Sequence, residues 1–271
     1  IKLESIEFGD KITTLGITCF NNCTALKKVY VPDNACNWTA YQDKAPFNGC
    51  TALEEFSVGG MDTIPRYLMR TNSKQMRKIT IRGSVRKIGE NAFYSMYYGN
   101  YNHPCELVIE EGVTAIGSNA FQGDSMLTSV SLPTTLDNIG GYAFSGCTQI
   151  GSLDLEGRGT AIGGSAFNGC TGLTSVMLKG VSEVGDGAFA ECSALNHVDL
   201  GEDLIKLGYR AFYKCTSLKD IYLPDSIAQW GERIFDYCTG IERVSVGGAG
   251  TASGLSISSP ELRQVVIRGS A

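Results

Sequence analysis

The residues best suited to chemistry are ten cysteines, because thiols can form disulfides or bind zinc. In units stacked as parallel strands, matching cysteines lie about 4.8 Å apart. Parallel Cβ vectors at that spacing are farther apart than the roughly 3.8 Å that a disulfide favours. No C-x-x-C pair occurs, and only two His are present, which disfavours zinc. We therefore predict buried free thiols that pack as small hydrophobic groups at the seven positions that follow a Phe by three residues: Cys23, Cys50, Cys147, Cys170, Cys192, Cys215 and Cys238.

The other candidate groups do not form a catalytic set. His197 is expected beside Asp220 on the next strand, as a solvated ion pair, and no nucleophile occupies a corresponding position. Glycines such as Gly117 and Gly140 recur once per unit, so they indicate turns and not a phosphate-binding loop. Cys36 and Cys105 lie in irregular insertions and either pair or stay free. We expect no enzyme activity, no cofactor and no metal site.

One repeated string positions these residues. Residues 184–200 read VGDGAFAECSALNHVDL, and nearly the same string occurs at 139–155, 162–178 and 207–223. Self-similarity at a fixed period of roughly 20 to 50 residues is typical of solenoids. A Phe marks each unit except one, and in that unit Leu68 is predicted to take its place. These marker residues are Phe20, Phe47, Phe93, Phe121, Phe144, Phe167, Phe189, Phe212 and Phe235.

The spacing of the marker defines the domain organisation. From Phe121 onward the steps are 23, 23, 22, 23 and 23 residues. We predict a single solenoid over residues 1–271, with about eleven units of about 23 residues. Its repeats are irregular over 1–120, with insertions at 34–46 and 94–104, and regular over 121–246. Residues 247–271 form an irregular last repeat.

Each unit is predicted to contain three short segments. The stretch Leu218 to Leu223 alternates apolar and polar residues, which indicates a strand buried on one face. An apolar pair ending in Gly, such as Val113 to Gly117, predicts a second extended segment. Ala-Phe-x-x-Cys has helical spacing and predicts one short helical turn. Stacking of the units would bury Phe, Cys and Leu in one continuous core.

The consensus I-G-x-x-A-F-x-x-C-x-x-L-x-x-V-x-L-P resembles the BspA-like leucine-rich repeats of bacterial surface proteins, over essentially the whole chain. Departures are Cys19 in place of the Ala, Pro46 before Phe47, and a unit at 61–81 with neither Phe nor Cys. The resemblance implies a repeat solenoid of the α/β class, curved and right-handed, with a parallel β-sheet on its concave side. It also implies secretion or surface display, with adhesion to host or bacterial partners.

Charge and hydropathy exclude two kinds of partner. The net charge is -5, and no basic block occurs, so a nucleic-acid partner is not expected. No apolar run approaches the roughly 18 to 20 residues of a membrane span, so no membrane insertion is expected in this segment.

Two surfaces are candidates for binding a partner. The insertions offer aromatic residues on loops, a composition that suits recognition, unless these side chains fold back over an irregular edge: Trp38, Tyr41, Tyr94, Tyr97, Tyr98, Tyr101 and His103. The rival is the concave face, where outward side chains should form two columns that vary between units. Its candidate residues are Tyr30, Asp154, Met177, His197, Asp199, Asp220 and Tyr222.

These observations favour a protein-binding or adhesion module, located extracellularly or at the cell surface. The partner is expected to be a host or bacterial surface protein. Two alternatives stay open: a carbohydrate-binding surface protein, and a structural spacer in a longer repeat array.

Overall fold

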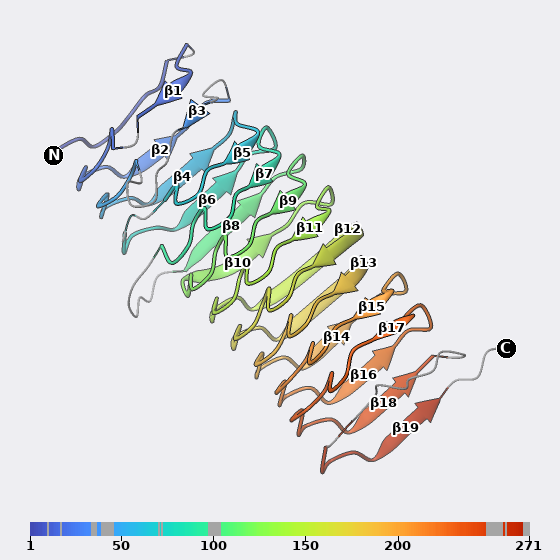
Figure 1. The fold of residues 1–271 in the computed structure, drawn as a ribbon. Coiled ribbons are helices and arrows are strands. Elements are labelled where there is room, and N and C mark those ends of the chain that lie inside the picture. Colours follow the sequence, from blue (N-terminus) through green and yellow to red (C-terminus); the bar gives the residue numbers. More distant parts are fainter. Residues whose placement is uncertain are drawn as a thin grey trace.

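The chain is described from a computed structural model that covers residues 1–9, 11–16, 18–33, 37–38, 46–69, 71, 73–96, 104–247, 257 and 259–267, with the backbone alone at 37–38 and 157–158. Figure 1 shows similar coils stacked along one axis, with β1 and β19 at opposite ends. The architecture is a parallel β-solenoid of about nine turns. Eleven units are not confirmed, because the first is joined by a single bridge, Ser5 with Lys28, and the last falls largely outside the described residues.

The strands form two rows, and every pairing is parallel. One row, the sheet face, contains β2 (Lys28–Tyr30), β4 (Glu55–Val58), β6 (Lys78–Ile81), β8 (Cys105–Ile109), β10 (Leu127–Ser131), β14 (His197–Asp199), β16 (Asp220–Leu223), β18 (Arg243–Val246) and β19 (Gln264–Ile267). The second row contains β1 (Thr14–Leu15), β3 (Asn37–Trp38), β5 (Thr63–Ile64), β7 (Lys87–Ile88), β9 (Ala115–Ile116), β11 (Asn138–Ile139), β15 (Lys206–Leu207) and β17 (Gln229–Trp230). Two longer strands, β12 (Ser152–Ile162) and β13 (Ser175–Val184), run through both rows.

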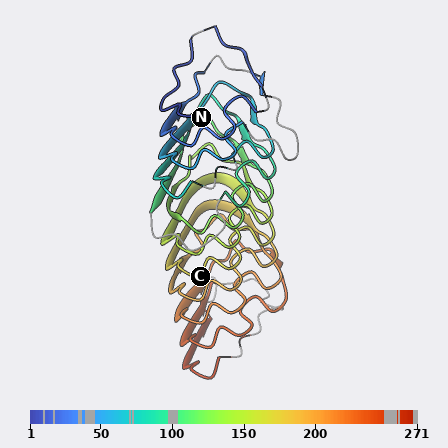
Figure 2. The ribbon, with the colours of Figure 1, turned by 90° about the vertical axis from the view of Figure 1, so that its left-hand side faces the viewer.

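The sheet face has the predicted strands and the predicted register. Along β16, Asp220 and Tyr222 are exposed while Ile221 and Leu223 are buried, as expected for a strand with one face on the core. Lys28 pairs with Glu55, and Glu55 pairs with Lys78, at equivalent repeat positions. Figure 2 shows the sheet-face strands following one another along one side of the stack. The predicted second extended segments are also present, as the short strands of the second row.

The marker Phe residues form a continuous stack in the core. From Phe93 to Phe235, successive rings lie 5.0 to 5.7 Å apart and are within 10° of parallel. The unit at 61–81 has no Phe, and Phe56 of the preceding strand β4 bridges the resulting gap in the stack, with edge contacts to Phe47 and Phe93. The marker position there belongs to Met69 and not to Leu68, because the Met69 N–H donates to Ala92 O as the Phe93 N–H donates to Ala120 O.

The prediction of buried free thiols is confirmed for the seven repeat cysteines. Their thiols also have a polar function. The Cys170 Sγ donates to Phe144 O at 3.2 Å, and Cys192 Sγ donates to Phe167 O at the same distance. Each such bond links a coil to the preceding one. The Phe carbonyl accepts this bond in addition to the N–H of the Cys in its own coil.

The prediction of a short helical turn is wrong, because no helix occurs in the described part of the chain. Ser145 and Cys147 donate N–H groups to carbonyls three residues earlier, whereas Phe144 and Gly146 donate to the following coil. An α-helix would direct all of these groups to its own segment. The alternation requires left-handed residues, such as Gly146 with φ 75°. The apolar spacing does not distinguish a helical turn from this series of turns, because both direct Ala, Phe and Cys toward the core.

The described residues contain no helix that is long and apolar enough to cross a membrane.

Candidate partner-binding face

The N-terminal half of the sheet face neutralises its own charges. One of its two columns of outward-facing side chains alternates Lys28, Glu55, Lys78 and Glu106 on successive strands. Lys28 Nζ lies 2.8 Å from Glu55 Oε1, and Lys78 Nζ lies 3.0 Å from Glu106 Oε2. The hydrogen bond to Glu55 raises the pKa of Lys28 above its ordinary value. Toward the middle, the same column contains only serines, Ser129, Ser152 and Ser175.

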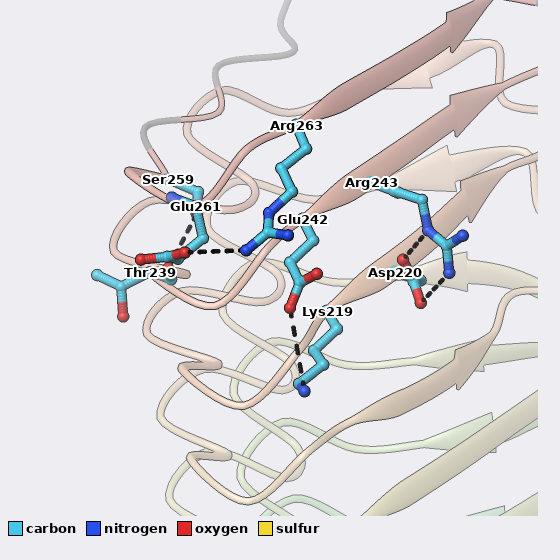
Figure 3. Close-up of polar contacts among 8 residues, drawn as sticks. All are labelled: Lys219, Asp220, Thr239, Glu242, Arg243, Ser259, Glu261 and Arg263. Atoms are coloured by element: carbon cyan, nitrogen blue, oxygen red, sulfur yellow. Dashed lines mark hydrogen bonds and ion pairs between the residues drawn. The ribbon is translucent and has the colours of Figure 1, made fainter.

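In the C-terminal half, the charged pair of Asp220 and Arg243 lies among other hydrogen-bonding side chains, those of His197, Tyr222 and Gln264. Arg243 donates from Nε to Asp220 Oδ1 at 2.7 Å and from Nη2 to Asp220 Oδ2 at 3.0 Å, so the pair is bidentate. These hydrogen bonds lower the pKa of Asp220. Figure 3 shows this pair beside further charged residues. Lys219 lies 4.0 Å from Glu242, and Arg263 lies 3.9 Å from Glu261.

The predicted ion pair between His197 and Asp220 is wrong. The Asp220 carboxylate binds Arg243 of the following strand, and His197 has no ion pair within the described residues. The Asp220 carboxylate binds the guanidinium rather than the imidazole, because the guanidinium is always charged and offers a carboxylate two parallel N–H groups.

Between β14 and β16 the hydrogen-bonded ladder of the sheet face is interrupted, although the two strands remain neighbours, and we call this interruption the C-terminal opening. β14 pairs with β13, and β16 pairs with β18, but no ladder joins β14 to β16 in the described part of the chain. A cavity of about 380 Å³ extends from β14 across β16 and β18 to β19. Its lining consists of His197, Val198, Asp220, Ile221, Tyr222, Arg243, Ser245 and Gln264.

A second interruption of the ladder, which we also call an opening, lies between β10 and β12 in the described part of the chain, although the Gly151 N–H still donates to Thr128 O. A cavity of about 350 Å³ lies there and includes Asp154 and Glu156. Both openings therefore interrupt the sheet where cavities occur, and the C-terminal one has the wider range of hydrogen-bonding groups.

The predicted sheet-face residues do not all come together. His197, Asp220 and Tyr222 line the C-terminal opening, whereas Asp154 lines the other one. Asp199 accepts a hydrogen bond from Gly201 N, and Met177 is partly buried. Tyr30 lies near the N-terminal end of the face, with the Arg82 guanidinium 4.1 Å from its ring centre.

Three residues were missed as site candidates: Arg243, Ser245 and Gln264. They belong to the same two columns, so the repeat register already placed them next to Asp220 and Tyr222. What the register could not indicate was the cavity that these side chains line together.

Most of the rival insertion site falls outside the described residues. Tyr41, Tyr97, Tyr98, Tyr101 and His103 lie outside the described residues, as does Cys36. The backbone of Trp38 pairs with Leu15, and Tyr94 is partly buried in the coil, where its N–H donates to Asn91 O. Cys105 is a buried free thiol.

Several of the buried thiols are chemically quiet, whereas Cys19 is exposed. Burial raises the pKa of Cys50 to about 11 and those of Cys105 and Cys170 to about 12, so the reactive thiolate is scarce at neutral pH. No group of three His, Cys, Asp or Glu side chains suited to a metal ion occurs among the described residues.

Comparison with known proteins gives the family. A search of curated proteins gave no match. Among solved structures, a leucine-rich cell surface protein from Faecalibacterium prausnitzii is 19% identical with a TM-score of 0.45, over 98% of this chain and 86% of that one. A leucine-rich repeat protein from Bacteroides ovatus is 20% identical with a TM-score of 0.36, over 90% of this chain and 86% of that one.

The family model of the BspA type leucine-rich repeat region matches residues 1–100, 97–179 and 177–254, with six copies. Since these matches span nearly the whole sequence, the chain belongs to the BspA-type leucine-rich repeat family.

Proposed function

We propose that this chain is a non-catalytic, protein-binding module of a bacterial cell-surface protein, and that it binds through the C-terminal part of its sheet face. We call this surface the C-terminal patch, and it consists of His197, Asp220, Tyr222, Arg243, Ser245 and Gln264. The observation that carries the proposal is the cavity that these side chains line together across strands β14, β16, β18 and β19. Membership of a family of surface repeat proteins supports the location.

The residue types at the patch suit a protein partner. Tyr and Arg are enriched among residues that dominate binding energy at interfaces. Tyr222 is 37% exposed, so its ring has area left to bury. The Asp220–Arg243 pair is held in place before binding, which reduces the side-chain ordering that association requires. Repeat solenoids commonly bind partners on an extended sheet face.

The charges around the patch are mixed and nearly balanced. Lys219 and Arg263 alternate with Glu242 and Glu261 beside the Asp220–Arg243 pair (Figure 3). A surface with alternating signs favours a partner whose own charges alternate, and it does not attract a uniformly charged polymer.

The test is binding of the purified chain to an array of extracellular host and bacterial proteins, followed by affinity measurement with each protein bound. A patch variant combines Tyr222→Ser with Gln264→Ala. Its matched control is Tyr142→Ser, which removes another exposed tyrosine from outside the sheet face. We expect the patch variant to bind at least tenfold more weakly and the control to bind as the parent does, with both variants melting like the parent.

The insertion hypothesis is tested in the same assay with Tyr97, Tyr98 and Tyr101 changed to Ser. Loss of binding in this variant alone would move the site to the insertion. Absence of binding to every protein on the array would favour the spacer alternative and contradict the proposed function.

A further inference from the structure

A groove with a different chemistry lies on the turns that follow the Phe stack. It has a volume of about 510 Å³ and runs across four coils. Its floor consists of the hydroxyl residues that directly follow the ladder cysteines, Thr171, Ser193, Thr216 and Thr239. Its wall consists of the residues that directly precede three of those cysteines, Glu191, Lys214 and Tyr237.

The wall exists only in this part of the solenoid. The position before the cysteine, or before the residue that replaces it, has a left-handed backbone in most described coils: it is Asn22 and Ser95 in two earlier coils and glycine in four, Gly49, Gly123, Gly146 and Gly169. Glu191, Lys214 and Tyr237 have φ values of 61°, 58° and 61° at the same position. This left-handed region is less favourable for a residue with a side chain than the right-handed region. Three consecutive coils therefore have large side chains at a position where four earlier coils have glycine.

The wall is also held in place by contacts. Lys214 Nζ lies 2.9 Å from Glu191 Oε1 and 5.1 Å from the ring centre of Tyr213. The Tyr213 ring contacts the Tyr237 ring edge-on at 5.4 Å. Tyr237 nevertheless remains 60% exposed, so one face of its ring is available to a ligand.

The chemistry of the groove restricts the ligand. Lys214 and Glu191 are the only charged residues among the described lining residues, and they neutralise one another, which disfavours a charged ligand. The remaining lining offers hydroxyl groups, Thr methyl groups and an aromatic ring. Hydroxyls both donate and accept hydrogen bonds, and aromatic rings combine apolar faces with a polar edge. A sugar, with an apolar C–H face and hydroxyls around its rim, matches this combination.

We propose that this groove binds a short neutral oligosaccharide, with one sugar stacked on Tyr237 and its neighbours along the hydroxyl floor. Four coils at about 4.8 Å per coil span roughly 14 Å, the length of about three sugar units. The site is separate from the C-terminal patch, and it does not depend on the proposed function.

The test is a glycan array that carries neutral and sialylated oligosaccharides of one to six sugars, followed by calorimetric titration with the neutral trisaccharide that binds best. The main variant is Tyr237→Gly, which removes the ring and restores the glycine found in four other coils, so the fold is kept. The matched control is Tyr142→Gly, which removes a 49% exposed tyrosine with φ 57° from outside the groove. Two further variants, Tyr237→Phe and Thr216→Val, separate the ring from the hydroxyl floor.

We expect a neutral trisaccharide to bind the parent. Its affinity should be at least tenfold lower for Tyr237→Gly and for Thr216→Val, and it should be unchanged for Tyr142→Gly and Tyr237→Phe. Absence of binding at millimolar concentration, or equal binding by parent and Tyr237→Gly, would overturn the assignment. Preference for sialylated glycans would overturn the argument from neutrality. Protein binding through the C-terminal patch should not change in Tyr237→Gly, so failure of either proposal leaves the other testable.

Discussion

At the scale of single residues, the cysteine thiols act as both packing groups and hydrogen-bond donors. Six of the ladder thiols donate to a Phe carbonyl of the preceding coil, at 2.9 to 3.2 Å. Because the ladder thiols are buried, and burial raises the pKa of Cys50, Cys147, Cys170, Cys192 and Cys215, a thiol-reactive probe should label few of them in the native protein. We expect at least seven labelled cysteines after denaturation without reductant, counted by intact mass. Ladder cysteines that stayed unlabelled in the denatured chain would indicate oxidation and contradict the ladder of free thiols.

Asp124 occupies the ladder position that belongs to Cys in most units, three residues after Phe121. It is fully buried, and its Oδ1 accepts the Met96 N–H at 2.8 Å while its Oδ2 has no hydrogen-bond partner. Burial raises the pKa of the carboxyl well above its ordinary value. Since the folded state binds the proton more tightly than the unfolded state, this group stabilises the fold fully below about pH 4, and the contribution falls as pH rises toward the raised pKa.

We therefore predict that Asp124→Asn changes the pH dependence of stability. Asn keeps the shape and the acceptor for Met96 N, but it does not ionise. The free energy of unfolding of the parent, relative to that of the variant, should decrease between pH 5 and pH 8, as measured by urea denaturation. A difference that stays constant over this range would show that Asp124 does not titrate differently in the folded state.

Several residue-level features could be predicted from the sequence, and others could not. The repeat register placed the Phe stack, the thiols and the two sheet-face columns, because each depends only on position within the unit. The same register could not choose the partner of Asp220, since His197 and Arg243 are both one strand away. Side-chain chemistry decides that question, and the bidentate geometry of Arg favours Arg243.

At the scale of elements, the turn that follows each second-row strand depends on left-handed residues. Gly146 has φ 75°, and a Cβ added there would meet nothing nearer than 3.7 Å, so backbone strain alone should govern a substitution. We expect Gly146→Ala to destabilise the fold by about 1 to 2 kcal/mol. Gly151→Ala is the matched control, because Gly151 has no neighbour within 4 Å of an added Cβ and no positive φ. Urea midpoints of the two variants check the prediction, and equal midpoints would contradict it.

The Phe stack predicts a larger effect. Phe189 is fully buried between Phe167 and Phe212, whose ring centres lie 5.3 and 5.4 Å away. The neighbouring rings are fixed in their own coils and do not fill the gap, so Phe189→Ala should cost about 3 to 5 kcal/mol. Thermal unfolding should show this loss, whereas a melting curve like that of the parent would show that the position tolerates a cavity.

The turn segments also show where pattern analysis reaches its limit. An i, i+3 spacing of apolar residues fits a helical turn and also a row of overlapping turns, because both direct the same side chains inward. The distinction lies in the backbone, where every second N–H bonds to the next coil. A recurring glycine two residues after the Phe, as at Gly123, Gly146 and Gly169, was the signal for a left-handed position.

At the scale of the whole molecule, the solenoid is continuous in its core but not in its sheet. The Phe stack runs without a break from Phe93 to Phe235, while the sheet face is interrupted between β10 and β12 and between β14 and β16. The second row still joins β15 to β17 beside the C-terminal opening. The sequence could not predict the openings, because the repeat register places the residues of adjacent strands side by side whether or not their backbones bond.

This discontinuity predicts an uneven distribution of local stability. In a solenoid each coil is stabilised by its neighbours, so a missing ladder lowers the stability of the coils that it should join. Amide hydrogens of β14 and β16 should exchange faster than those of β12 and β13, which share a ladder through both rows. Hydrogen exchange followed by mass spectrometry of peptides from each strand provides the measurement.

The comparison has an internal control, because β18 lies beyond the opening yet pairs on both sides, with β16 and β19. Faster exchange in β14 and β16 than in β18 would locate the weakness at the opening. A smooth decrease in protection toward the C-terminus would instead reflect fraying from the end. Binding of a partner at the C-terminal patch should slow exchange in β14 and β16 selectively, because a ligand that fills the opening stabilises the closed backbone around it.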